Sequence, residues 1–134
     1  MDMDILNTAG SALISERLRM DVIASNLANA NTTHDSKGAN NPYQRKIVQF
    51  ETIYDQKTGL SKGVNVASVT EDGSPLKRVY EPGHPDADEQ GYVDYPNVSV
   101  EREMVDMVTA KTAYEANIKS IQVFKSMFNS ALEI

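Results

Sequence analysis

The chain has 134 residues, of which 40% are hydrophobic and 24% charged, and its formal net charge is −6. This composition is typical of one soluble globular domain with a core of modest size. The acidic balance argues against nucleic acid as a partner, because nucleic acid is bound by clusters of Lys and Arg. The absence of cysteine excludes disulfides, thiolate nucleophiles and thiolate metal ligands.

The first residues predict neither a cleaved signal nor a membrane anchor. Asp2 and Asp4 stand where a signal peptide would be basic, and no run of about 7–15 apolar residues follows them. No stretch is long and apolar enough to span a bilayer, so we expect that this is not an integral membrane protein. The protein is expected to stay in the cytosol or to be exported without a cleaved signal peptide.

Proline and glycine divide the chain into three segments. All five prolines and six of the seven glycines fall between residues 32 and 97. We therefore expect an N-terminal helix in residues 1–33, a middle segment of strands and loops in residues 34–97, and a C-terminal helix in residues 98–134. The predicted fold class is α+β, in which the two long helices form an elongated, coiled-coil-like pair beside a small β-rich middle segment.

The N-terminal helix carries apolar residues at seven-residue intervals, the period at which one helix lies along another. Glu16 interrupts the pattern once. At about 1.5 Å per residue, this helix is expected to be roughly 40 Å long. The residues expected to pack within the helix pair are Leu6, Leu13, Met20, Ile23 and Leu27.

The C-terminal helix repeats this arrangement. Ser99 is expected to cap its first turn, in which Glu101 and Glu103 are favoured by the helix dipole. The expected length is roughly 50 Å. On this helix the residues expected in the pair are Met107, Tyr114, Ile118, Ile121 and Phe128.

The middle segment is predicted to hold short strands separated by turns. β-branched and aromatic residues predict strands over residues 47–54, 64–70 and 76–81, whereas residues 32–41 and 82–91 read as loops. The basic pair Arg45 and Lys46 is expected to decorate the edge of the first strand.

Both helices also carry apolar residues away from the seven-residue pattern. A helix that is apolar on nearly all sides has to be buried on nearly all sides. We expect that the middle segment cannot cover both remaining faces along some 40 Å, so that other subunits cover them. Ordinary intramolecular core is the alternative, and periodicity leaves open which face is which. The residues expected in intersubunit packing are Ile14, Leu18, Val22, Val105, Val123, Phe124 and Met127.

Two loop sequences contain residue types used in catalysis or metal binding. His84 is followed by Asp86, Asp88 and Glu89, which could suggest a metal site or a hydrolase, but the loop is flanked by Pro and Gly. The His34–Asp35 pair lies in a polar loop, where a catalytic triad would lack the required geometry. We therefore favour solvated loops, and expect no enzyme activity, no metal and no cofactor.

The end of the N-terminal helix carries the feature that identifies a family. It resembles the signature shared by the axial proteins of the bacterial flagellum, in the residues Ser25, Asn26, Leu27, Ala28 and Asn29. The rest of the chain resembles the proximal rod proteins of that group. The further matching segments are residues 42–46, 63–69, 79–87, 91–93, 96–98, 103–105 and 114–117.

This resemblance implies a structural subunit of the basal-body rod, in the cell envelope on the periplasmic side, which transmits torque. It also implies export through the flagellar type III apparatus without a cleaved signal peptide. The implied partners are other rod subunits, copies of the chain itself, the basal-body membrane ring or its adaptor, and the export apparatus. The alternative is a soluble helical adaptor or export chaperone, which binds partner helices without polymerising.

Overall fold

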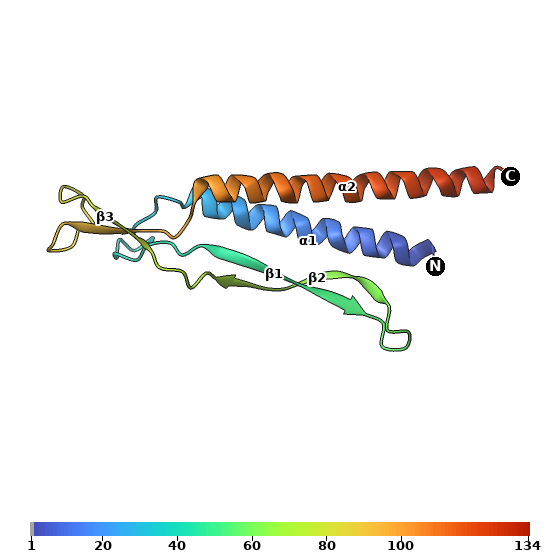
Figure 1. The fold of residues 1–134 in the computed structure, drawn as a ribbon, viewed down its shortest axis with the longest axis horizontal. Helices are drawn as coiled ribbons and strands as arrows, with labels where there is room; N and C mark the ends of the chain where they lie inside the picture. Colours follow the sequence, from blue (N-terminus) through green and yellow to red (C-terminus); the bar gives the residue numbers. More distant parts are fainter. Residues whose placement is uncertain (1) are drawn as a thin grey trace.

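The computed structural model describes residues 2–134, and it has two long helices with strands between them (Figure 1). The α+β class is therefore confirmed. In chain order the elements are α1 (Asp2–Ala28), β1 (Lys46–Tyr54), β2 (Ser61–Glu71), β3 (Lys77–Tyr80), β4 (Tyr92–Tyr95) and α2 (Val100–Leu132).

The two helices lie side by side and run in opposite directions (Figure 1). α1 has 27 residues and α2 has 33, so that α2 projects beyond the start of α1. The predicted cap at the start of α2 is confirmed, because the Ser99 hydroxyl accepts a hydrogen bond from the backbone N–H of Arg102 at 3.5 Å. Between Val100 and Leu132 no glycine or proline interrupts the helix, which suits its unbroken length.

The strands form two separate antiparallel pairs. β1 pairs with β2 in a long hairpin that places Val48 opposite Val69, and β3 pairs with β4 so that Val79 lies opposite Val93. The three predicted strands are present, and β4 is an additional one. β4 has four residues, of which the buried apolar one is Val93.

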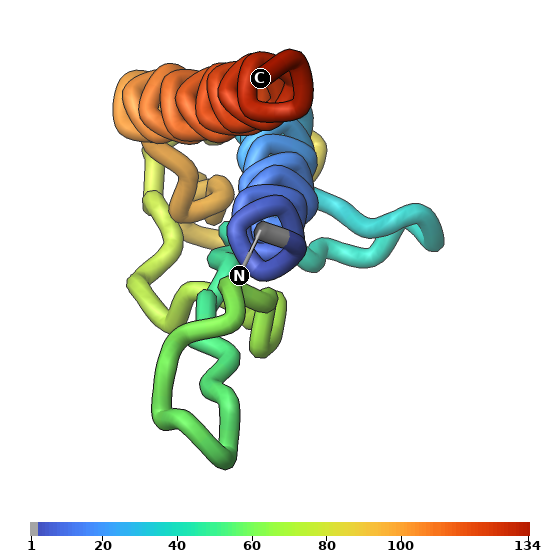
Figure 2. Tube along the Cα trace, turned by 90° about the vertical axis from the view of Figure 1, so that its right-hand side faces the viewer, coloured from blue at the N-terminus to red at the C-terminus, as the bar shows by residue number. Residues whose placement is uncertain are grey.

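The β1–β2 hairpin lies along α1, on a different side from α2 (Figures 1 and 2). The middle segment was expected to be unable to cover the remaining faces of both helices, and the hairpin covers one side of α1 only, where Ile14 and Leu18 still remain exposed. An 11-residue strand spans roughly 35 Å. That length nearly matches α1, so one hairpin covers most of one side of the helix, whereas α2 has no equivalent cover.

Small polar residues of α1 hold the hairpin. The Thr8 hydroxyl donates to the carbonyl of Lys62 at 3.2 Å, and the Ser11 hydroxyl accepts from the N–H of Val64 at 3.1 Å. Gly63 lies between Lys62 and Val64 and has a φ of 146°, and a Cβ added to it would come within 2.4 Å of the Ser11 hydroxyl oxygen. Gly63 is thus required both for its backbone conformation and for the close approach of the strand.

The buried core lies toward the end of the molecule where α1 ends and α2 begins. Among the described residues, the buried apolar side chains are Ile23, Val93, Val98 and Ala110. They come from the end of α1, from β4 and the segment after it, and from the first turns of α2. Toward the opposite end the helices diverge, and their apolar side chains become more exposed (Figure 1).

Candidate assembly surfaces and polar junction

An apolar stripe runs along the side of α2 that faces away from α1. Val105, Val108, Val123 and Met127 lie on this side at helical spacing, and each is between 59% and 65% exposed. We call these four residues the α2 stripe. Val105 and Val108 lie in the first half of α2 and Val123 and Met127 lie near its end, so the stripe consists of two exposed apolar pairs on one side of the helix, and such grouping is typical of an interaction surface.

α1 carries a shorter exposed row between the sides covered by α2 and by the hairpin. Ile14 is 74% exposed and Leu18 is also exposed. Val22 was expected to face a neighbouring subunit with them, but it is partly covered. It lines a small cavity with Arg45 and Ile47, because its position on the helix faces the hairpin.

The residues expected within the helix pair mostly lie on the facing sides of the two helices. Ile23 is buried, and Leu13, Met20, Leu27, Met107, Tyr114, Ile118 and Ile121 are half-buried. Leu6 and Phe128 differ from this expectation, since both are exposed. Leu6 lies in the first turns of α1 and Phe128 in the last turns of α2, seven residues after the half-buried Ile121 and thus on the same side of the helix. Phe124, expected to contact a neighbour, is half-buried on the inner side of α2.

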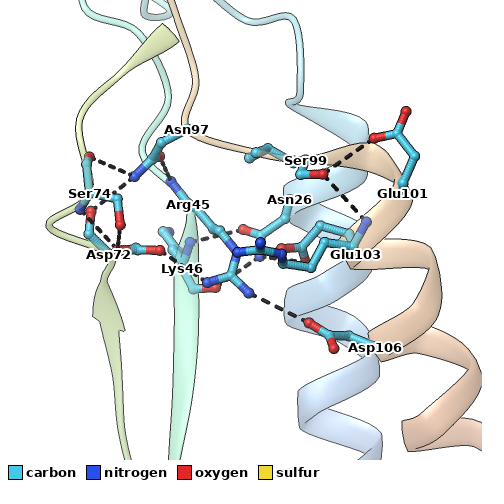
Figure 3. A network of polar contacts seen from close by, with 12 residues as sticks. Asn26, Arg45, Lys46, Asp72, Ser74, Asn97, Ser99, Glu101, Glu103 and Asp106 are labelled. Atoms are coloured by element: carbon cyan, nitrogen blue, oxygen red, sulfur yellow. Dashed lines mark hydrogen bonds and ion pairs between the residues drawn. The ribbon is translucent and has the colours of Figure 1, made fainter.

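A network of polar side chains joins the end of α1, the start of β1 and the start of α2 (Figure 3). We call it the polar junction, and its side chains are those of Asn26, Arg45, Asp72, Asn97, Glu103 and Asp106. The signature residue Asn26 is buried and makes four hydrogen bonds. Its amide donates to the carbonyl of Lys46 at 2.8 Å and to the Glu103 carboxylate at 3.2 Å, and its oxygen accepts from Lys46 N–H at 2.9 Å and from the Tyr43 hydroxyl at 2.8 Å.

Arg45 is the cation of this junction, so the prediction that it decorates a strand edge is wrong. Its guanidinium binds the fully buried carboxylate of Glu103 through Nε. It also lies 3.1 Å from the Asp72 carboxylate and 3.6 Å from that of Asp106. Burial of Arg45 lowers its pKa, but the hydrogen bonds and charges of Glu103 and Asp72 outweigh this effect, so that the pKa is raised.

One signal in the sequence could have identified this ion pair. Glu103 lies four residues before Met107 and seven before Ala110, which places its carboxylate on the inner side of α2. A charge on the buried side of a helix requires a partner of opposite charge. The family signature includes Asn26, but its pairing with Lys46 depends on a contact between distant segments, which no local pattern predicts.

The two histidine-containing loops contact each other, but their contacts differ from those of a metal site or a catalytic triad. His34 lies 3.2 Å from the carboxylate of Asp86, which belongs to the other loop, and Thr33 donates to the same carboxylate at 2.6 Å. His84 accepts a hydrogen bond from the backbone N–H of Asp86 at 3.0 Å. Within residues 2–134, no group of three or more His, Cys, Asp or Glu side chains is placed to hold a metal ion. These contacts tie the two loops together.

None of the helices in the described part of the chain combines the length and the apolar character that crossing a bilayer requires.

Known protein families match the sequence of both helices, including the signature at the end of α1. Residues 6–33 match the family described as "Flagella basal body rod protein", and residues 89–134 match "Flagellar basal body rod FlgEFG protein C-terminal". The "Flagellar basal-body rod protein FlgC" of Borreliella burgdorferi is 42% identical over an alignment that covers 96% of this chain and 94% of the relative. The chain belongs to the FlgC family.

Further FlgC proteins show similar agreement. That of Bacillus subtilis is 42% identical, with 96% of this chain and 95% of the relative covered. That of Salmonella typhimurium is 44% identical, with 98% and 96% covered. The predicted resemblance is therefore confirmed, and the chain is a structural subunit of the flagellar basal-body rod. FlgC belongs to a family of structural proteins rather than enzymes, which assemble with other components of the basal body.

Proposed function

We propose that the chain builds the rod through its two helices, with the outer sides of both packed against neighbouring subunits. The observation that carries this proposal is the α2 stripe, four apolar side chains that are more than half exposed on one chain. Burying each large apolar side chain contributes roughly 1.5–3 kcal/mol, so the stripe favours association strongly. In an isolated molecule the same surface would contact water.

The proposal divides the apolar residues into two groups. The subunit's own helix pair uses Leu13, Met20, Ile23, Leu27, Met107, Tyr114, Ile118 and Ile121, joined by Phe124 in the half-buried row. Neighbouring subunits contact Ile14, Leu18, Val105, Val123 and Met127, joined by Leu6, Val108 and Phe128. In this division α1 and α2 are the packing elements of the subunit, and the β1–β2 hairpin of the middle segment lies against α1.

We further propose that the rod subunit transmits torque through this packing. Close apolar contact resists shear along its whole length, whereas exposed ion pairs are weak and screened by salt. The polar junction supports this role, because it ties the hairpin to both helices at one end of the pair. The three elements then move together rather than separately.

The remaining partners are inferred from membership of the FlgC family. We propose export through the flagellar type III apparatus without a cleaved signal peptide, assembly on the periplasmic side of the cell envelope, and contact with the basal-body membrane ring or its adaptor. Copies of the chain and other rod subunits supply the helices that cover the α2 stripe.

The proposal is tested with Leu18→Glu and Val123→Glu in one chain. Both positions are exposed, so the isolated subunit should fold and be exported normally, while burial of two carboxylates between subunits prevents assembly. Motility and rod formation are measured in a bacterium that lacks its own FlgC. The matched control, Gln56→Glu with Thr70→Glu, places the same charge on exposed positions of the hairpin. Normal rods from the first variant would contradict the proposal.

The second candidate, a soluble adaptor or export chaperone, also uses exposed apolar stripes. It differs in one measurable property, because an adaptor stays monomeric as its concentration rises. Sedimentation of the purified chain over a range of concentrations distinguishes the two.

A further inference from the structure

The β1–β2 hairpin contributes almost nothing to the hydrophobic core. No residue of β1 is buried, and the one buried residue of β2 is Gly63, which has no side chain. A two-stranded hairpin without a buried apolar face is marginally stable at best. The position of this hairpin therefore depends on the contacts that hold it against α1.

Along its length the hairpin is held to α1 by hydroxyl groups. Thr8 donates to the Lys62 carbonyl at 3.2 Å, and Ser11 accepts from the Val64 N–H at 3.1 Å. Ser15 donates to the Val64 carbonyl at 3.4 Å. Water can replace such bonds when the two elements separate, so their net contribution is modest. They fix where the hairpin lies but hold it weakly.

The base of the hairpin has stronger contacts, and these lead to α2 (Figure 3). Arg45 lies just before β1 and Asp72 just after β2, and the Asp72 N–H donates to the Arg45 carbonyl at 2.7 Å. Asn97, three residues before α2, accepts from the Arg45 N–H at 2.8 Å and donates to the Asp72 carbonyl at 3.1 Å. The Arg45 guanidinium binds the Glu103 carboxylate in the first turn of α2.

Side chains alone connect α2 with the hairpin. In the part of the chain that the structure describes, the backbone of α2 contacts that of α1 but neither β1 nor β2. The buried Glu103 carboxylate is held by Asn26 of α1 and by Arg45 at the base of the hairpin. A buried carboxylate that loses its partners is costly. Docking of α2 and placement of Arg45 therefore favour each other, as any two coupled contacts must.

We propose that the hairpin is a strap that closes over α1 only when the first turns of α2 have docked. Without docked α2, Arg45 lacks Glu103 and Asp106, and the hydroxyl contacts along α1 are left to hold the hairpin. The hairpin then opens locally while α1 stays helical. The strap is a property of the single subunit, so it goes beyond the proposed function and does not depend on it.

The amide proton of Val64 reports on the strap directly, because it donates to the Ser11 hydroxyl across the contact with α1. Its exchange with solvent is measured by NMR on the full chain in dilute solution. The variant Ala110→Asp places a carboxylate on the buried side of α2 and undocks its first turns. The control, Val108→Asp, places the same charge on the side of α2 where residue 108 is 64% exposed. The amide of Leu13, inside α1, reports on unfolding of that helix.

In Ala110→Asp the Val64 amide should exchange at least about tenfold faster, while the Leu13 amide should change by less than about threefold. Val108→Asp should change neither rate. When Arg45→Met is already present, Ala110→Asp should accelerate Val64 exchange by less than about twofold, because the connection is gone.

Three results overturn the inference. They are an unchanged Val64 rate in Ala110→Asp, equal acceleration of the Val64 and Leu13 amides, and the same acceleration of Val64 with and without Arg45. Where Ala110→Asp does not fold, alone or with Arg45→Met, Ala110→Ser takes its place and is judged by the same criteria, since it buries a smaller polar group.

Discussion

Asn26 pairs with Lys46 in the way that one strand residue pairs with another. Its side-chain amide donates to the Lys46 carbonyl at 2.8 Å and accepts from the Lys46 N–H at 2.9 Å. A helix side chain thereby completes the backbone hydrogen bonding of the first residue of β1. The family signature thus includes a residue that fixes where the hairpin starts relative to α1.

Replacement of Asn26 by Ala should lower the free energy of unfolding by about 3 kcal/mol. The substitution leaves both backbone groups of Lys46 without their partner beside a buried carboxylate, and each unsatisfied group costs about 1–3 kcal/mol. Urea unfolding followed by circular dichroism measures the change. Asn7→Ala, on the exposed side of the same helix, is the control and should change stability by less than about 0.5 kcal/mol. A similar loss in both variants would argue against the special role of Asn26.

The ion pair between Arg45 and Glu103 should respond unequally to removal of its two partners. Arg45→Met leaves the Glu103 carboxylate buried without a cation, which costs about 3–5 kcal/mol. Glu103→Gln keeps a polar group of the same shape, and Arg45 retains Asp72 and Asp106, so the cost should be about 1–2 kcal/mol.

Thermal and urea unfolding of both variants measure this asymmetry. The control is Lys111→Met, which removes the exposed pair with Glu115 and should change stability by less than about 1 kcal/mol. If Glu103→Gln proved the more damaging substitution, the buried carboxylate would not be the group that requires Arg45.

Substitution of Gly63 by Ala should displace the hairpin from α1. Its φ of 146° is unfavourable for a residue with a side chain, and the new methyl group would meet the Ser11 hydroxyl. We expect a loss of about 1–3 kcal/mol in stability. Gly73→Ala is the matched control, because a Cβ there meets nothing within 4 Å. Amide exchange of β2 measures the displacement, and unchanged protection would contradict it.

The helices could be predicted from the sequence because their signals are local. Seven-residue spacing, the Ser99 cap and the absence of proline each act within a few turns, and they gave both helices and their pairing. The exposure of residues near the helix ends was harder to predict from the sequence. Phe128 follows the inner pattern of α2, but periodicity does not indicate that its side chain is left exposed.

The hairpin and the polar junction depend on contacts between distant segments. Thr8, Ser11 and Ser15 are small polar residues of a helix, and no local pattern indicates that they bind the backbone of β2. Arg45 stands beside Lys46 in the sequence and resembles a surface pair. Only the fold brings it to Glu103, which is 58 residues away.

The stability of the protein should fall in acid, in part through Asp72. The Ser74 hydroxyl and backbone N–H donate to the Asp72 carboxylate at 2.7 Å and 2.9 Å, and with Arg45 they lower its pKa below the usual 3.8. A carboxylate with a lowered pKa in the folded state binds fewer protons there than in the unfolded chain. Its contribution is therefore present at neutral pH and is lost as the pH falls below about 5.

Asp72→Asn should accordingly lower stability at neutral pH, and its stability should fall less than that of the native chain as the pH is lowered. The profiles of the two proteins should converge at low pH, because the native carboxylate is then protonated and has lost its ionic contacts. Urea midpoints between neutral pH and about pH 3 measure both effects. Asp94→Asn, at an exposed position on β4, is the control. Parallel profiles for the native chain and Asp72→Asn would contradict the assignment, because the difference would then not depend on protonation of Asp72.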